Sequence, residues 1–236
     1  MHTSIRTILV STFCFLIFLY GLIVGKYEIF PYELMKYARN VIAPSDNSST
    51  PKSIERLELF RKFDSKADLA FVGDSLTAGG LWNEWFPNYL TINRGIGGDR
   101  TSDVTARLDN IVSAHPRRIF LMIGINDIHQ YVSVSEILRN YGSIVDSLKA
   151  ESLGVVIQST IQCELRECGN RHVNSINTLN EGLSKLAAEK NVPFLFLGEL
   201  SSKDGLNAIY TTDGVHLSAL GYLYWKDKIR AHIDEI

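Results

Sequence analysis

The sequence lacks the features that mark nucleic-acid-binding, repetitive or metal-rich proteins. Its 24 lysines and arginines stand against 26 acidic residues, and a net charge of −2 gives no basic excess to attract nucleic acid. No repeat of roughly 20 to 50 residues occurs, which argues against a solenoid or propeller. With 45% hydrophobic and 21% charged residues, the 236-residue chain is long enough for one well-buried domain plus a tail.

Cysteine is scarce, with three residues in the whole chain. Cys163 and Cys168 lie in the segment CELREC, which we expect to be a loop, and a lone pair at this spacing is a poor zinc site. The two are close enough in sequence to form a disulfide, which would persist only in an exported compartment. Two free thiols are the open alternative. We predict no metal and no other cofactor.

Charge is absent from Ile8 to Gly25, where the chain reads ILVSTFCFLIFLYGLIVG. As a helix this run would be about 27 Å long, enough to cross the apolar core of a bilayer. The segment GLIVGKYE at the end of this run has no small-x-small cleavage site. We therefore interpret residues 1–26 as an uncleaved membrane anchor in preference to a signal peptide. Basic residues flank the run on both sides and leave its orientation ambiguous. The cysteine pair favours a single-pass protein with its domain on the exported side.

Residues 27–54 are expected to connect this anchor to a domain at 55–236. The first part mixes aromatic and charged side chains, as segments at a membrane interface do. The second part, APSDNSSTPKS at 43–53, has the polar, Pro- and Ser-containing composition of a linker.

From residue 55 onward, short apolar runs alternate with helical patterns. Continuous apolarity indicates strands that are covered on both faces, and alternation of strands with helices predicts a parallel sheet between helical layers. The five predicted strands lie at 69–73, 90–93, 119–124, 154–159 and 193–198. Ser133 and Glu136 form a capping box that opens one of the helices, and a last helix is expected to run to the C-terminus.

The polar signals of the domain follow the predicted strands. They are GDSLT at 73–77, NRGIGGD at 93–99 and GINDI at 124–128, with DGVHL at 213–217 before the last helix. Singly, each is explained by helix capping or turn formation. Because binding sites of open parallel sheets gather at the carboxyl ends of the strands, we expect the four segments to meet there.

Together these segments supply the groups needed for acyl transfer. Ser75 is the candidate nucleophile, His216 the base that takes its proton, and Asp213 the carboxylate that orients the imidazole. The candidate oxyanion donors are the backbone N–H groups of Ser75 and Gly98 and the side-chain amide of Asn126.

These four segments, in this order, resemble the SGNH hydrolase superfamily, also called the GDSL esterases and lipases. The marker Ser, Gly, Asn and His of that superfamily correspond to Ser75, Gly98, Asn126 and His216, and the resemblance covers about residues 67–236. INRGIGGDRT and DGVHLSALGY look like the branch of platelet-activating-factor acetylhydrolase catalytic subunits. The resemblance implies a flavodoxin-like α/β/α sandwich, a metal-free mechanism and hydrolysis of carboxylic esters, often acetyl esters.

The α/β-hydrolase fold is excluded by two departures from its pattern. Its nucleophile motif is G-x-S-x-G, and Thr77 stands where the second glycine should be. In that fold the acidic residue also lies much further before the histidine in the sequence, whereas Asp213 and His216 are three residues apart.

The expected function is that of a membrane-anchored serine esterase acting on an acylated glycan, a lipid or a small ester. An O-acetyltransferase of cell-surface glycans would use the same residues, and a non-catalytic binding module is the third hypothesis. The sequence defines no oligomeric state.

Overall fold

The computed structural model describes residues 2–27, 51–62, 66–202 and 204–233, and it divides the chain into two units. The first unit, Met1–Ser45, contains helix α1 (His2–Tyr27), which covers the predicted apolar run. Among the described residues, no helix combines the length and apolar character needed to cross a membrane, so the predicted span over residues 1–26 is not supported. The predicted interface segment and most of the predicted linker lie outside the described residues.

The second unit, Asp46–Ile236, is built on a five-stranded parallel sheet of order β2-β1-β3-β4-β5. Its strands are β1 (Leu69–Gly73), β2 (Thr91–Gly95), β3 (Arg118–Met122), β4 (Gly154–Gln158) and β5 (Phe194–Leu195). The predicted parallel sheet is therefore confirmed. The last strand is shorter than predicted because the chain leaves the sheet and enters a 3-10 turn, η1 (Gly198–Leu200).

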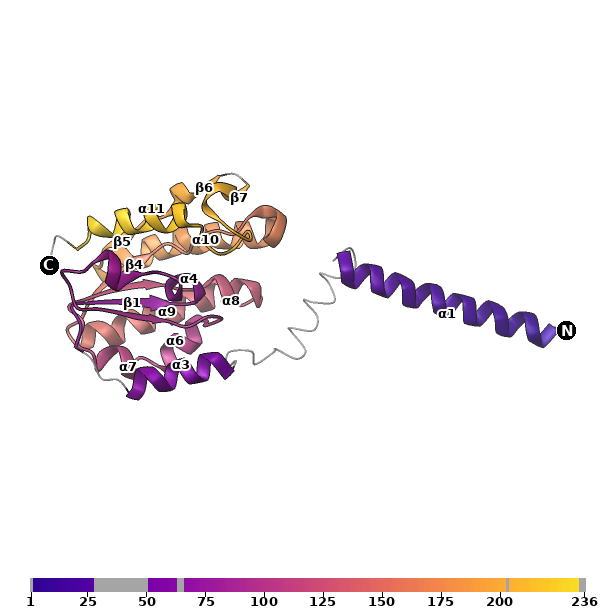
Figure 1. Cartoon of the computed structure of the whole chain (residues 1–236), viewed down its shortest axis with the longest axis horizontal. Coiled ribbons are helices and arrows are strands. Elements are labelled where there is room, and N and C mark those ends of the chain that lie inside the picture. Colours follow the sequence, from indigo (N-terminus) through magenta and orange to yellow (C-terminus); the bar gives the residue numbers. More distant parts are fainter. Residues whose placement is uncertain (1, 28–50, 63–65, 203, 234–236) are drawn as a thin grey trace. The chain divides into compact units, whose positions relative to one another are not determined.

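Helices cover both faces of this sheet (Figure 1). Successive side chains of a strand point to opposite faces, so Ala70 and Val72 enter one core cluster while Leu69 and Phe71 enter another. The helices with side chains in the first cluster are α6 (Thr101–Ala106), α7 (Asp109–Val112), α8 (Ile125–His129), α9 (Val134–Ala150) and α10 (Leu165–Lys190). Those in the second are α4 (Ser75–Ala78), α5 (Trp82–Trp85) and α11 (Ala219–Arg230). The predicted three-layer arrangement follows from these two clusters.

Helix α3 (Pro51–Lys62) extends the domain beyond its predicted start at residue 55. Arg56 Nε donates to the Gly95 carbonyl at the end of β2 (2.7 Å), and the Arg94 guanidinium lies 4.6 Å from the centre of the Phe60 ring. These contacts bind α3 to the edge strand. The end of the predicted linker, residues 51–53, is thus the first turn of α3.

The segment before α11 is compact although it has little regular structure. A two-residue hairpin, β6 (Ser201–Ser202) and β7 (Gly205–Leu206), precedes the 3-10 turn η2 (Ala208–Tyr210). Ser218 then caps α11, which ends at Arg230 instead of continuing to the C-terminus as predicted, and residues 234–236 lie outside the described part.

Candidate active site

Ser75 begins helix α4 directly beyond the carboxyl end of β1. The residue between them, Asp74, is the N-cap of the helix, and its carboxylate accepts a hydrogen bond from the Leu76 N–H (3.0 Å). Because Asp74 provides the cap, the Ser75 hydroxyl is left for a different partner. The Tyr222 hydroxyl of α11 donates to the carbonyl of Leu76, the residue after Ser75 (2.8 Å), and so links the last helix to the serine's helix.

The structure brings Ser75, His216 and Asp213 into one chain of hydrogen bonds. Ser75 Oγ lies 3.0 Å from His216 Nε2, and His216 Nδ1 lies 2.7 Å from Asp213 Oδ2. The bonds that Asp213 accepts from the His216 ring and from the His216 and Val215 backbones lower the pKa of this carboxyl to about 2. Asp213 is therefore ionised at neutral pH, as a carboxylate that orients a histidine must be.

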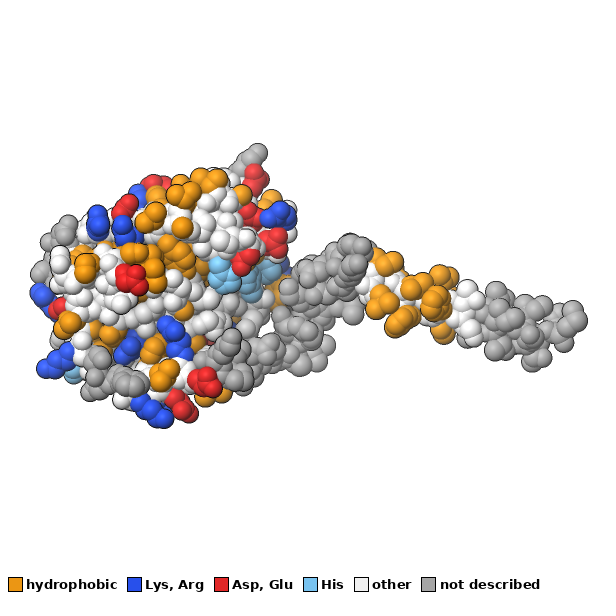
Figure 2. Space-filling view, in the orientation of Figure 1, with side chains coloured by type: hydrophobic (Ala, Val, Ile, Leu, Met, Phe, Trp, Pro, Cys, Tyr) orange, Lys and Arg blue, Asp and Glu red, His pale blue; other side chains and the backbone are white. Residues whose placement is uncertain are grey.

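The loop that carries Asp213 and His216 is closed by its own hydrogen bonds. Thr211 Oγ1 donates to the His216 carbonyl (2.7 Å) and accepts from the Gly214 N–H (2.9 Å). Gly214 has a φ of 87°, which a residue with a Cβ adopts only under strain. The His216 and Asp213 side chains are about half exposed, at 47% and 53%, so a ligand can approach them from solvent. Histidine and acidic side chains lie together on the face shown in Figure 2.

The predicted oxyanion donors besides Ser75 lie in the glycine loop after β2 and in the first turn of α8. A Cβ added at Gly97 would lie 3.7 Å from the Ser75 Cβ, which places the glycine loop against the serine. Gly98 is exposed and has a φ of 86°. One amide proton of Asn126, at the start of α8, is donated to the Asp99 carbonyl (2.9 Å). A side-chain amide has two such protons, so the second is left for an oxyanion.

A buried ion pair, which the sequence did not reveal, holds the glycine loop that carries Gly98 and Asp99. Arg107 Nε lies 2.8 Å from Asp99 Oδ2, with both side chains at most 3% exposed. Arg107 Nη2 also donates to the carbonyls of Gly73 (3.3 Å) and Arg94 (2.9 Å), at the ends of β1 and β2. Burial raises the pKa of Asp99 to about 6, and the Arg107 charge opposes that rise.

Two further carboxylates near the site have structural partners. Burial raises the pKa of Asp74 to about 7 and that of Asp127 to about 6. Asp127 accepts from the Thr101 hydroxyl (2.6 Å) and backbone N–H (3.0 Å), and so joins α8 to the start of α6. Neither carboxylate is hydrogen-bonded to Ser75 or His216 among the contacts of the described residues.

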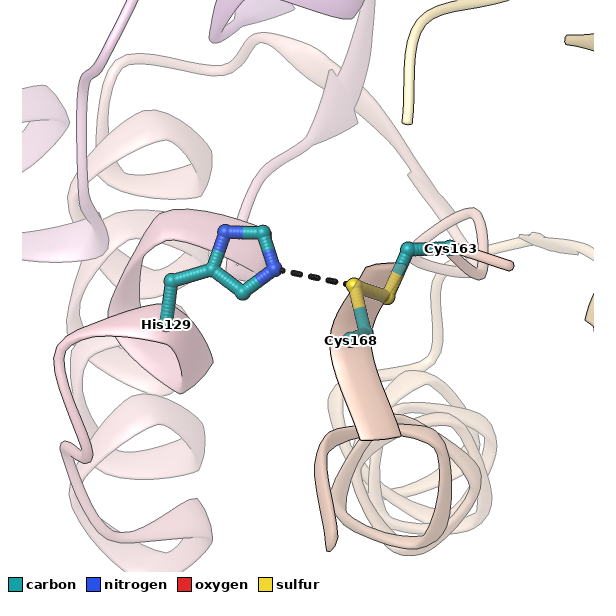
Figure 3. Close-up of side chains that lie close together, drawn as sticks. All are labelled: His129, Cys163 and Cys168. Carbon is teal, nitrogen blue, oxygen red and sulfur yellow. Dashed lines mark hydrogen bonds between the residues drawn. A yellow bond between two sulfur atoms is a disulfide. The ribbon is translucent and has the colours of Figure 1, made fainter. Parts of the chain in front are cut away.

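Cys163 and Cys168 form a disulfide, with 6.2 Å between their Cα atoms. Figure 3 shows that His129 points at this bond, and its Nε2 lies 3.3 Å from Cys168 Sγ. These three side chains are the one group among the described residues close enough together to hold a metal ion. Metals bind cysteine as the thiolate, and both sulfurs are bonded to each other here, so we assign no metal to the group.

The disulfide-closed turn lies against the histidine loop. The Glu164 N–H donates to the Gly214 carbonyl (2.7 Å), and the Leu206 N–H donates to the Cys163 carbonyl (3.1 Å). The predicted loop at CELREC is in part the first turn of α10, which begins at Leu165. The turn thus joins the end of β4 to the loop that carries Asp213 and His216.

A parallel sheet covered on both faces, with polar loops beyond its carboxyl edge, defines the class of doubly wound α/β proteins, which bind ligands at that edge. Residues 71–223 match the GDSL-like Lipase/Acylhydrolase family, and the chain belongs to that family. This assignment agrees with the resemblance to the GDSL esterases and lipases that the sequence motifs indicated.

Named relatives add detail to this assignment. The rat platelet-activating factor acetylhydrolase IB subunit alpha1 is 29% identical over 172 residues, which cover 67% of this chain and 72% of that protein. The N-acylneuraminate cytidylyltransferase of Streptococcus agalactiae is 26% identical over 177 residues, but the match spans 75% of this chain and only 41% of that protein. The acetylxylan esterase Axe2 of Geobacillus stearothermophilus has the same fold, with a TM-score of 0.59, 22% identity and coverage of 73% and 96%.

Proposed function

We propose that the protein is a serine esterase that hydrolyses acetyl or other short-acyl esters. The observation that carries the proposal is the continuous hydrogen-bonded path from Ser75 Oγ through His216 to Asp213. Acetyl esters are favoured because a family relative is named as an acetylhydrolase and a structural neighbour as an acetylxylan esterase.

In the proposed reaction, Ser75 Oγ attacks the ester carbonyl while His216 Nε2 accepts its proton. The carbonyl oxygen becomes an oxyanion, which the N–H groups of Ser75 and Gly98 and the free amide proton of Asn126 stabilise. His216 then returns the proton to the leaving alcohol. A water molecule attacks the acyl-enzyme, with His216 again transferring the proton, and the acid is released from Ser75. Ionised Asp213 holds the imidazole in the tautomer that this exchange requires.

Acyl transfer to a sugar hydroxyl is the second candidate function. The half-exposed Asp213 and His216 favour it, because an acceptor alcohol can reach the acyl-enzyme as readily as water can. The two reactions differ in their products when a sugar acceptor is present: free acid for the hydrolase and an acylated sugar for the transferase. A non-catalytic binding module is disfavoured by the complete hydrogen-bonded chain at Ser75, and a fluorophosphonate probe that failed to label Ser75 would restore that hypothesis.

We also propose that the esterase domain acts on the exported side of a membrane. The Cys163–Cys168 disulfide supports an oxidising compartment. The exposed aromatic side chains of α1, such as Phe13 and Phe18, support attachment through the N-terminal segment. Protease accessibility of the domain in intact cells checks the side, and carbonate extraction checks the attachment.

The central test compares the purified protein with Ser75→Ala on p-nitrophenyl acetate. We expect the variant to lose activity by at least about a thousandfold, because no other group can form the acyl-enzyme. Equal rates for the two proteins would overturn the esterase proposal. Thermal unfolding of both proteins controls for loss of the fold.

A further inference from the structure

A cavity of the domain, about 840 Å³ in volume, lies away from Ser75. Its walls come from the residues that follow β4, from those that follow β5 and from one side of α10, and its lining includes none of the five proposed active-site residues. Both it and the Ser75 site therefore open at the carboxyl edge of the same sheet. β5 is three strands from β1, or about 14 Å at the usual strand spacing.

The aromatic wall of the cavity is the ring of Phe196, which is 54% exposed. A Cβ added at Gly198 would lie only 2.0 Å from the ring's Cζ atom, so the ring rests directly on the backbone of that glycine. Phe194 adds a second ring, with its centre 6.5 Å from that of Phe196. An exposed ring held in one place is a suitable surface for the apolar C–H face of a sugar.

The polar wall contains a buried acceptor without a partner. Gln162 is 5% exposed, and its Nε2 donates to the Val173 carbonyl (3.1 Å) and to Asn177 Oδ1 (2.7 Å). Its Oε1 has no hydrogen-bond partner among the described residues. That oxygen is closed to solvent, so Gln162 supports the cavity wall through the two hydrogen bonds that its Nε2 donates to α10.

The remaining lining distinguishes between classes of ligand. Glu181 and Lys185 contribute one charge of each sign, and Ser184, Ser201 and Ser202 contribute hydroxyl groups. The cavity therefore has no net charge with which to select an anion. A neutral, polyhydroxylated ligand with apolar faces fits both the rings and the hydrogen-bonding groups.

We propose that this cavity is a saccharide-binding subsite. It holds a glycan chain beside the carboxyl ends of β4 and β5 while an ester group on the same chain reaches Ser75. The inference rests on the proposed esterase function and identifies its substrate class as acylated oligo- or polysaccharides. It assigns Phe196 as the stacking surface.

The test uses the full chain and two variants of the cavity. Phe196→Ala removes the ring, and Ser184→Trp fills the cavity from an exposed position on α10. Leu90→Ala is the matched control, because it also truncates an exposed apolar side chain (65% exposed) but lies just before β2, at the opposite edge of the sheet. Calorimetry measures the binding of xylohexaose, cellohexaose and chitohexaose, none of which carries an ester.

We expect wild type and Leu90→Ala to bind at least one hexasaccharide, and both cavity variants to bind it at least about tenfold more weakly. On an acetylated form of the same polymer the cavity variants should show a raised KM, while p-nitrophenyl acetate is hydrolysed at the wild-type rate. If wild type binds none of the three sugars, or the cavity variants bind as wild type does, the subsite is overturned. Hydrolysis of p-nitrophenyl acetate reports separately on the esterase proposal, so the two failures are distinguishable.

Discussion

At the scale of single residues, the carboxylates of the site belong to two environments. Asp213 is half exposed and fully hydrogen-bonded, which keeps its pKa low, whereas burial raises the pKa of Asp74. Only the first can serve as a permanently charged partner of a histidine at neutral pH. The proposed oxyanion donor Gly98 carries no charge, and its φ of 86° is a backbone geometry that favours glycine.

Replacement of Asp213 by asparagine should lower kcat on p-nitrophenyl acetate by about a hundredfold to ten-thousandfold. The amide can accept the backbone bonds of the loop but cannot stabilise an imidazolium, and it favours the wrong imidazole tautomer. Steady-state kinetics measure the loss. Asp227→Asn on α11 is the control, and it should leave kcat unchanged. A variant at Asp213 with wild-type kcat would contradict the proposed role.

Replacement of Gly98 by alanine should lower kcat at least about tenfold with little change in KM. A Cβ at this position meets nothing within 4 Å, so the effect comes from backbone strain of roughly 1–2 kcal/mol, which turns the N–H away from the oxyanion. Gly142→Ala, in the interior of α9, makes the same chemical change at ordinary helical geometry and should leave kcat intact. An active, equally stable Gly98→Ala protein would remove Gly98 from the oxyanion site.

At the scale of elements, the disulfide-closed turn and the histidine loop form one unit. The Glu164–Gly214 hydrogen bond joins them directly. A Cβ added at Gly214 would meet the Glu167 side chain at 2.2 Å, so this side chain packs directly on the Gly214 backbone. The turn is thereby a support for the loop that presents His216 to Ser75.

The double change Cys163→Ser and Cys168→Ser should therefore lower kcat about three- to tenfold and change KM by a smaller factor. Without the bond the turn gains conformational freedom, and a displacement of His216 by even 1 Å is costly in rate. Cys14→Ser, which removes the one free cysteine, is the control. Unchanged kinetics in the double variant would show that the loop's own hydrogen bonds suffice.

The elements that the sequence predicted are those with a local signal. β1 and β4 are continuous apolar runs, and Ser133 caps α9 through the Glu136 N–H as its capping box indicates. Strand β5 ends early where the chain turns into η1, and α3 joins the domain because it contacts residues distant in the sequence. Arg107 was missed for the same reason, since nothing in its own sequence shows that it is buried beneath the glycine loop.

At the scale of the whole molecule, buried acids link stability to pH. Burial raises the pKa of Asp74 to about 7 and that of Asp99 and Asp127 to about 6, whereas in the unfolded chain all three would titrate near 4. Between these values the folded protein binds more protons than the unfolded chain does. Its stability therefore decreases as the pH rises through this window.

We expect the free energy of unfolding in urea to fall by a few kcal/mol between about pH 4.5 and pH 7.5. Asp74→Asn should flatten this slope, because the amide can still cap α4 through the Leu76 N–H but does not titrate. Equilibrium unfolding followed by fluorescence measures both proteins. A stability that rises across this range, or a variant with the wild-type slope, would contradict the assignment of these buried carboxyls.

The hydrogen bond between Ser75 and His216 joins residues 141 positions apart in the chain. During synthesis the serine and its strand leave the ribosome long before the base that activates it. A nascent or truncated chain that stops before Asp213 carries the nucleophile without the means to remove its proton, and it also lacks α11, whose Trp225 lies in the core. If the proposed mechanism holds, an incomplete chain has no active nucleophile, and the complete site forms only when α11 packs into the core.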